Sequence, residues 1–309
     1  MYITAPTFTL GLFSSTIMKD VLIRSIFGAV FLMVVFTPFV YDLQYQANML
    51  NLVFFLFTLL GIHELFQISL ATGKKSNMKV PSLLTASALF LPFLLQTASS
   101  FFTINNNVFW KFYTSYNLLI VFWGIFTICV IIFSFWIFKK ESIQFLLKTP
   151  FILSIAYPIL PMWILSFAYT ATPSEDKSIL LIILLPIYLN DTLAYVFGRL
   201  AGKNLMLPSV SPKKTWEGFI GGLFGAATTM LALLYFVGQF TLSNAVSIGL
   251  ISILASVLAT LGDLFESKLK RSAGVKDSGN ILPGHGGILD RIDAMLFVAP
   301  ILYVLIFLI

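Results

Sequence analysis

Long apolar segments recur along this chain, and they restrict its fold more than any other feature. A helix needs about 20 apolar residues to cross the roughly 30 Å hydrocarbon layer of a bilayer, and its backbone polar groups must be satisfied within the helix. With 58% hydrophobic and 10% charged residues among 309, an ordinary soluble globule is excluded. We therefore predict an all-α, polytopic integral membrane protein with about nine transmembrane helices, at residues 26–40, 49–70, 80–96, 117–138, 151–171, 179–197, 219–237, 245–264 and 292–309.

The cations between these segments predict how the chain is oriented in the membrane. Lys and Arg are retained on the cytoplasmic side during insertion. With the N-terminus cytoplasmic and the C-terminus outside (periplasmic), only Lys111 and Lys177 of the 19 Lys and Arg residues fall on the outer side. The inner cations face anionic headgroups, which accounts for the net charge of +6. We expect membrane lipids and no nucleic acid as partners, and no removed signal peptide.

The loops divide the chain into two regions of one continuous membrane domain. In residues 1–178 the connections carry few polar groups beyond topology-setting lysines, so we predict a transmembrane scaffold, in which Glu64 is left without a role. In residues 179–309 carboxylates enter or border the apolar segments, and two long loops combine glycine, proline and lysine. We predict that this second region is catalytic.

The most polar stretch runs from Ser267 to Asp293, between the last two apolar segments. Asp290 and Asp293 are three residues apart at the start of a predicted helix, so they project from one face. Capping of the helix and binding of Mg²⁺, which takes one or two carboxylates, explain this pair equally well. Asp263 lies at a helix C-terminus, where an acid opposes the dipole, which favours a functional role. Glu266 has the i,i+4 spacing to a lysine that is typical of an ion pair.

The glycines of the same stretch predict an anion site. Gly279 to Gly287 read GNILPGHGG, and glycine allows successive N–H groups to point at one anion, to which His285 can also donate. A simple turn is the alternative. Four neighbouring bases favour phosphate binding: Lys268, Lys270, Arg271 and Lys276.

The loop after the sixth segment holds a second group of candidate residues. We expect Ser211 to cap a helix whose first residue is Pro212, which places a positive helix end beside Lys213 and Lys214. Anchoring of the segment at the membrane interface is the alternative. The glycines that follow predict close helix packing.

Asp191 lies inside the sixth apolar segment, where a carboxylate is a functional hypothesis by default. It shares a helix face with Tyr195 and Arg199. Pairing with Arg199 is the structural alternative.

Taken together, these residues resemble the phosphatidate cytidylyltransferases, the CDP-diacylglycerol synthases. The similarity covers residues 186–300 and is carried by two stretches. The first comprises Asp191-Thr192, Tyr195, Gly198-Arg199 and Ser211 to Gly218. The second comprises Ser267 to Arg271, Lys276-Asp277, Gly279, Leu282-Pro283, His285 to Gly287, Asp290-Arg291 and Asp293.

The resemblance implies a nucleotidyltransferase that moves the CMP moiety of CTP onto phosphatidate and releases pyrophosphate, at the cytoplasmic face of the inner (plasma) membrane. It also implies a homodimer that requires Mg²⁺, with a second, monovalent cation left open. The metal would be held by Asp263, Asp290 and Asp293. Catalytic roles fall to these three and to Ser267, Lys268, Lys270, Arg271, Lys276, Asp277, His285 and Arg291. Substrate binding falls to Asp191, Tyr195, Arg199, Ser211, Lys213, Lys214, Thr215, Glu217, Gly286 and Gly287.

Two other functions use similar residues. A CTP-dependent lipid or polyprenol kinase would transfer the terminal phosphoryl group instead of the nucleotidyl group. A transporter for an anionic solute, a different class of protein, needs polar residues along a path through the bilayer. The charges of this chain crowd the cytoplasmic ends of the segments, which is evidence against the transporter.

Overall fold

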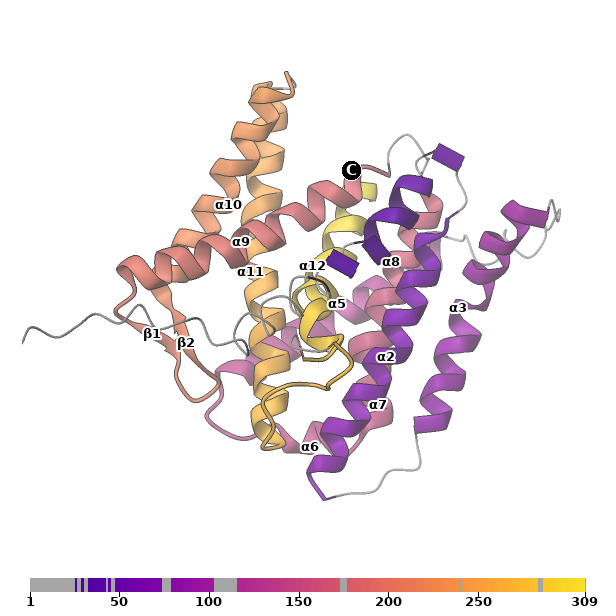
Figure 1. Ribbon diagram of the computed structural model, residues 1–309, viewed down its shortest axis with the longest axis horizontal. Coiled ribbons are helices and arrows are strands. Elements are labelled where there is room, and N and C mark those ends of the chain that lie inside the picture. The colour runs from indigo at the N-terminus through magenta and orange to yellow at the C-terminus, as the bar shows by residue number, and fades with distance from the viewer. Residues whose placement is uncertain are drawn as a thin grey trace, which may run out of the picture.

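The fold is a bundle of long helices with one small hairpin at its side (Figure 1). The computed structural model describes residues 26, 29–30, 33–42, 44–45, 48–73, 79–102, 116–172, 177–238, 240–282 and 286–308. Its elements are α2 (Leu50–Ala71), α3 (Lys79–Phe102), α5 (Tyr116–Phe138), α6 (Gln144–Leu147), α7 (Pro150–Ser154), the π-helical turn η1 (Ile155–Ile159), α8 (Leu160–Ala171), α9 (Ile179–Ala201), β1 (Leu205–Leu207), β2 (Ser211–Thr215), α10 (Trp216–Phe236), α11 (Leu242–Ser272) and α12 (Leu289–Leu308).

Six helical segments in the described part of the chain are long and apolar enough to cross a membrane, so the prediction of a multi-pass membrane protein is supported. They are Leu50–Ala71, Ile120–Phe138, Pro150–Ala171, Ile179–Ala201, Trp216–Phe236 and Leu242–Ser272. The other three predicted segments correspond to a shorter apolar helix, Met33–Asp42, and to α3 and α12. The number nine and the orientation of the termini therefore stay predictions.

The core of the bundle lies around α8, which belongs to Pro150–Ala171, the most buried of the six segments. Helices α2, α3, α5 and α12 pack against it, and the indole of Trp163 on α8 donates a hydrogen bond to the Leu89 carbonyl oxygen of α3 over 3.1 Å. Helix α10 is among the least buried and projects from the bundle together with the first half of α11 (Figure 1). Its apolar side chains Ile220, Phe224, Leu233 and Phe236 are exposed, as expected of a helix that faces lipid.

Four aromatic rings join the helices beneath the polar residues of α11. Phe133 of α5 stacks on Phe265 of α11 with ring centroids 4.3 Å apart. Tyr157, in the π-helical turn, meets Phe265 edge-on at 5.1 Å, and Phe297 of α12 lies 5.7 Å from Phe265. Such pairs add about 0.5–1.5 kcal/mol each beyond burial of their area. They fix α11 against α12 immediately beside Glu266.

The predicted close packing by glycines is confirmed between α9 and α10. A Cβ atom at Gly222 would lie 2.8 Å from both the Ala194 Cβ and the Asn190 carbonyl oxygen. Gly218, Gly221 and Gly225 meet α9 in the same way. The absence of side chains lets the two helix backbones approach closely.

The expectation that Ser211 caps a helix beginning at Pro212 was wrong. Residues 211–215 instead form β2, which pairs antiparallel with β1, so the fold is not purely helical. Helix α10 begins at Trp216, and its cap is Thr215, whose side-chain oxygen accepts the N–H of Gly218 at 3.1 Å. A threonine cap satisfies an otherwise unpaired helical N–H as well as a serine does.

Substitution of Gly222 with alanine should destabilise the protein and distort α9. The added Cβ has no room, and overpacking of this kind costs about 1–3 kcal/mol. Thermal unfolding in detergent should show a lower melting temperature.

Gly249→Ala is the matched control, since a Cβ at this helical glycine of α11 meets nothing within 4 Å. It should stabilise the helix by about 0.5–1 kcal/mol. Equal shifts for the two variants would refute the close-packing interpretation.

Candidate active site

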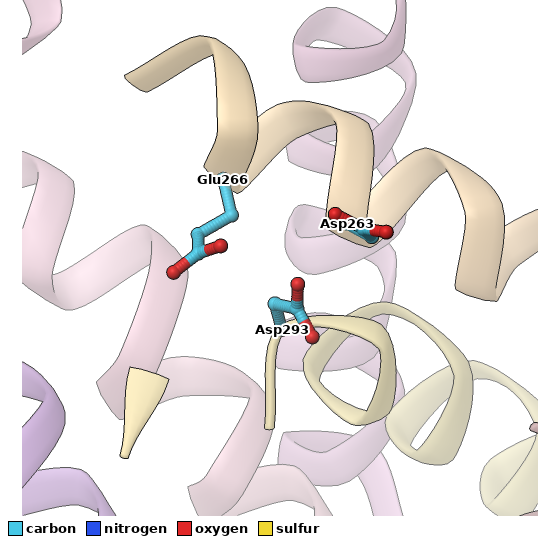
Figure 2. Close-up of side chains that lie close together, drawn as sticks. All are labelled: Asp263, Glu266 and Asp293. Carbon is cyan, nitrogen blue, oxygen red and sulfur yellow. The ribbon is translucent and has the colours of Figure 1, made fainter. Parts of the chain in front are cut away.

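Three carboxylates from two facing helices meet at the centre of the site. Asp263 and Glu266 lie one turn apart on α11, and Asp293 lies in the first turns of α12 (Figure 2). Each offers one oxygen such that the three atoms lie within 4.8 Å of one another. The approach depends on Gly262, because a Cβ there would stand 2.6 Å from the Asp293 carbonyl oxygen. We call these three residues the carboxylate cluster.

Two lysines compensate part of this negative charge. The Lys214 ammonium, from β2, lies 2.5 Å from an oxygen of Asp263. The Lys270 ammonium bridges Glu266 and Asp290, so the i,i+4 ion pair expected from the sequence is confirmed. Asp293 forms no ion pair with any residue that the structure describes; its Oδ1 accepts only the N–H of Ala294, at 2.7 Å. The cluster therefore keeps uncompensated negative charge, which a cation would stabilise.

Asp290 has a different environment from the one expected of a metal ligand. Its carboxylate accepts the Lys270 ammonium at 2.5 Å, the N–H of Ser278 at 3.0 Å and the N–H of Gly287 at 2.8 Å. The structure thus brings Glu266, in place of Asp290, together with Asp263 and Asp293. The signal for Glu266 in the sequence was its three-residue spacing from Asp263.

The contacts of Asp290 also set its protonation. Burial raises the pKa of this carboxyl, but the Lys270 ammonium and the two backbone N–H groups outweigh burial, so the pKa lies below its ordinary value. Asp290 is consequently ionised at neutral pH. Its contribution to stability is present above the ordinary carboxyl pKa and is lost as the pH falls through the lowered one.

A cavity of about 240 Å³ opens directly over the carboxylate cluster, and we call it the acidic cavity. Its walls are almost entirely ionisable. They are formed by Asp191, Asp263, Glu266, Lys270, Asp277, Asp290, Arg291 and Asp293. The structure therefore brings these acids and bases together around one cavity.

A second cavity, of about 480 Å³, lies between the β1–β2 hairpin and helices α9 to α11, and we call it the hairpin cavity. It combines basic, hydroxyl and apolar groups. Its predicted members are Asp191, Tyr195, Arg199, Ser211, Lys213, Lys214 and Thr215, and its further walls include Asn190, Met206, Phe219, Thr260 and Asp263. Asp191 and Asp263 line both cavities, so the two spaces adjoin at these carboxylates.

The alternative pairing of Asp191 with Arg199 does not form in this structure. Arg199 donates to the Tyr195 hydroxyl at 3.1 Å, and no ion pair of Asp191 occurs among the described residues. Asp191 instead faces both cavities from the middle of α9.

Glu217 lies outside both cavities and holds the hairpin in place. It accepts the Asn204 side-chain amide at 2.7 Å and the backbone N–H of Lys203 at 3.1 Å. Glu217 thus joins the start of α10 to the residues just before β1, beside the hairpin cavity but not in its lining.

Lys268 also points away from the site. Its ammonium donates to the carbonyl oxygens of Trp136, Ile137 and Lys139 at the end of α5, 2.7 Å and 3.1 Å from the first two. Cations commonly bind such unpaired carbonyl groups at a helix C-terminus. The structure therefore gives Lys268 a different environment from the phosphate site expected of it.

The remaining predicted residues fall into three groups. Ser267 donates to Asp263 at 3.2 Å and so belongs to the edge of the cluster. Arg271 and Lys276 are exposed and line neither cavity, and Arg271 donates to the Val275 carbonyl oxygen. His285 lies outside the residues that the structure describes.

The glycine-rich turn directs its N–H groups at the chain's own carboxylates. Gly286 has a positive φ of 84°, which glycine adopts without strain. The N–H of Gly287 donates to Asp290, and those of Ile288 and Leu289 donate to Glu64. Glu64, which sequence reasoning left without a role, is thus a contact of this turn.

Comparison with known proteins gives concordant matches. A sequence profile described as the cytidylyltransferase family matches residues 22–309. A phosphatidate cytidylyltransferase of Staphylococcus haemolyticus (strain JCSC1435) is 34% identical over 278 residues, 90% of this chain and 96% of the relative. That of Staphylococcus aureus (strain COL) is 43% identical over 176 residues, 57% of this chain and 65% of the relative. That of Staphylococcus epidermidis (strain ATCC 12228 / FDA PCI 1200) is 34% identical over 252 residues, 82% of this chain and 87% of the relative.

Replacement of Lys268 with methionine should lower stability, because three carbonyl groups of α5 lose their donor. Groups left without a partner in this way cost about 1–3 kcal/mol. Thermal unfolding in detergent measures the loss. Lys276→Met removes an exposed lysine of the loop that follows α11 and should leave the melting temperature unchanged. A similar drop in both variants would contradict the capping role.

Proposed function

The chain belongs to the cytidylyltransferase family, and we propose that it catalyses the reaction named for its relatives, in which CTP and phosphatidate give CDP-diacylglycerol and pyrophosphate. It is a nucleotidyltransferase of phospholipid biosynthesis. The observation that supports this function best is the carboxylate cluster at the junction of two cavities, one acidic and one partly basic.

The bond changes in this reaction place modest demands on the protein. A phosphate oxygen of phosphatidate forms a bond to the α-phosphorus of CTP, and the bond from that phosphorus to the bridging oxygen breaks, so pyrophosphate leaves. The attacking phosphate is already ionised, so no general base is required. The chain has to align two polyanions and reduce their repulsion.

The carboxylate cluster fits Mg²⁺. Hard divalent cations prefer oxygen ligands, and Asp263, Glu266 and Asp293 offer three within 4.8 Å of one another. We assign the metal to these three residues, so Glu266 replaces Asp290 in the set expected from the sequence. When bound, Mg²⁺ would supply positive charge to the phosphate oxygens of the substrates.

The bases around the cluster bind and orient the phosphates. Lys213, Lys214 and Arg199 line the hairpin cavity, which has room for a phosphorylated substrate. Lys270 and Arg291 line the acidic cavity, where Lys270 forms ion pairs with both Glu266 and Asp290. Because Asp191 and Asp263 belong to both cavities, the reacting phosphates would meet at these residues.

The membrane placement that accords with this function is the one expected from the sequence. Nine spans with a cytoplasmic N-terminus put the site at the inner face of the plasma membrane, where CTP is available and phosphatidate reaches it sideways. The acyl tails cannot leave the bilayer without a cost of about 0.8 kcal/mol per CH₂. We also propose a homodimer, as the family resemblance implies.

Labelled CTP tests the reaction itself. Purified protein in detergent with phosphatidate, Mg²⁺ and α-labelled CTP should place the label in the lipid product, and a chelator should prevent this. Label from the γ-phosphorus in the lipid would favour a CTP-dependent kinase instead. Uptake of an anionic solute into proteoliposomes without nucleotide turnover would favour a transporter.

Asp293→Asn should separate activity from stability. Removal of one charge weakens the metal site, and turnover should fall about 100-fold or more. Mutation of residues that only hold metal ligands in place already costs up to about 100-fold, so loss of a ligand should cost at least as much. The same change relieves repulsion among three carboxylates, so the melting temperature in chelator should rise.

Asp42→Asn is the control for this variant. Asp42 accepts the N–H groups of Met49 and Leu50 and the Tyr169 hydroxyl, and it lies in neither cavity. Its substitution should lower the melting temperature and leave the Mg²⁺ dependence of turnover unchanged. An Asp293→Asn enzyme of near-normal activity would refute the metal assignment.

A further inference from the structure

Glu64 of α2 binds the turn that precedes α12. Its side chain is fully buried, and it accepts three hydrogen bonds from residues more than 200 positions away. One oxygen accepts the Ser278 hydroxyl at 2.8 Å and the N–H of Leu289 at 2.8 Å, and the other accepts the N–H of Ile288 at 2.9 Å.

The turn is built closely around this carboxylate. A Cβ at Gly287 would lie 2.4 Å from a Glu64 oxygen and 2.0 Å from the Ser278 hydroxyl. A Cβ at Gly279 would lie 2.8 Å from the other Glu64 oxygen. Only glycine allows the backbone to come so near the Glu64 carboxylate, so a larger residue at either position would displace Glu64 or the turn.

Glu64 forms no ion pair among the residues that the structure describes, although a buried charge without compensation costs several kcal/mol. Its compensation comes from three donors, two of which are N–H groups at the start of α12, where the helix dipole favours an anion. The carboxylate is thus stabilised by hydrogen bonds from the turn itself and depends on the turn keeping its shape.

The same turn binds a second carboxylate on its other side. The N–H groups of Ser278 and Gly287 donate to Asp290, which also contacts the Lys270 ammonium. Lys270 in turn binds Glu266 of the carboxylate cluster. A continuous chain of hydrogen bonds and ion pairs therefore runs from α2, through the turn, to the edge of the acidic cavity.

We propose that Glu64 is a positioning residue for the metal-binding carboxylates. It fixes the turn so that Asp290 and Lys270 hold Glu266 in place and so that α12 begins where Asp293 faces α11. Glu64 touches neither substrate nor metal, and it acts through the residues between. This inference rests on the proposed function, because that function is what assigns a metal to the cluster.

Glu64→Gln is the sharpest test, since it keeps the size of the side chain. In either orientation of the amide, its NH₂ group would face the backbone N–H of Ile288 or Leu289. Two donors cannot bond to each other, so at least one hydrogen bond is lost. The Mg²⁺ concentration for half-maximal activity should rise about 10-fold or more, as is typical when a residue that holds metal ligands in place is changed. The KM for CTP at saturating Mg²⁺ should change far less.

Ser278→Ala removes one of the three donors and leaves the carboxylate in place. It should move the Mg²⁺ requirement in the same direction by a smaller factor. Should Glu64→Gln fail to fold, this milder variant carries the test.

Ser69→Ala is the matched control on the same helix. Ser69 is buried and donates to the Leu147 carbonyl oxygen at 2.6 Å, away from the turn. Its substitution should lower the melting temperature and leave the Mg²⁺ requirement unchanged.

A second readout is independent of turnover. Mg²⁺ alone should raise the melting temperature of the wild-type protein in detergent, and Glu64→Gln should reduce that rise at a given Mg²⁺ concentration. If both Glu64→Gln and Ser278→Ala retain the wild-type Mg²⁺ response, or behave like Ser69→Ala, the positioning role is overturned. If instead the wild-type protein makes no CDP-diacylglycerol, the proposed function fails, while the melting measurement still reports on Glu64.

Discussion

Repulsion among three carboxylates at the junction of α11 and α12 is the constraint on which the rest of the site depends. Only 10% of the residues are charged, and a membrane protein places acids this close together at considerable cost. The surrounding structure opposes the repulsion from two directions. The aromatic rings around Phe265 hold the two helices together from within the bundle, and Lys214 and Lys270 approach from the cavity side.

The N-terminal half of the chain contributes to this site more than a passive scaffold would. The end of α5 binds Lys268, and α2 binds the turn before α12 through Glu64, so both ends of the polar stretch are anchored to the first half of the sequence. The predicted division into a scaffold and a catalytic region describes where substrates would bind. It does not describe how α2 and α5 of the first region hold that site in place. The π-helical turn at Ile155–Ile159 adds a third anchor through Tyr157.

The sequence predicted the features that depend on composition and on local spacing. Apolar length located the helices, and the family resemblance, not helical spacing, is what grouped Asp263 with Asp293. The direction in which a side chain points was harder to predict. Spacing alone cannot tell whether the ammonium of Lys268 reaches a phosphate or a helix end, and Ser211-Pro212 has the composition of a helix start although it begins a strand. The contacts of Glu64 span 214 positions or more, which a single sequence does not reveal.

The backbone contact at Gly262 has a consequence for ion selectivity. Two helices that touch through a glycine cannot move apart without losing that packing, so the spacing of the two backbones that carry the cluster is set by the main chain. On the metal assignment proposed above, a rigid frame of this kind would discriminate by ionic radius. It suits a small cation with ligand distances of about 2.0–2.1 Å, whereas calcium, which prefers six to eight oxygens at about 2.3–2.6 Å, would require the frame to expand.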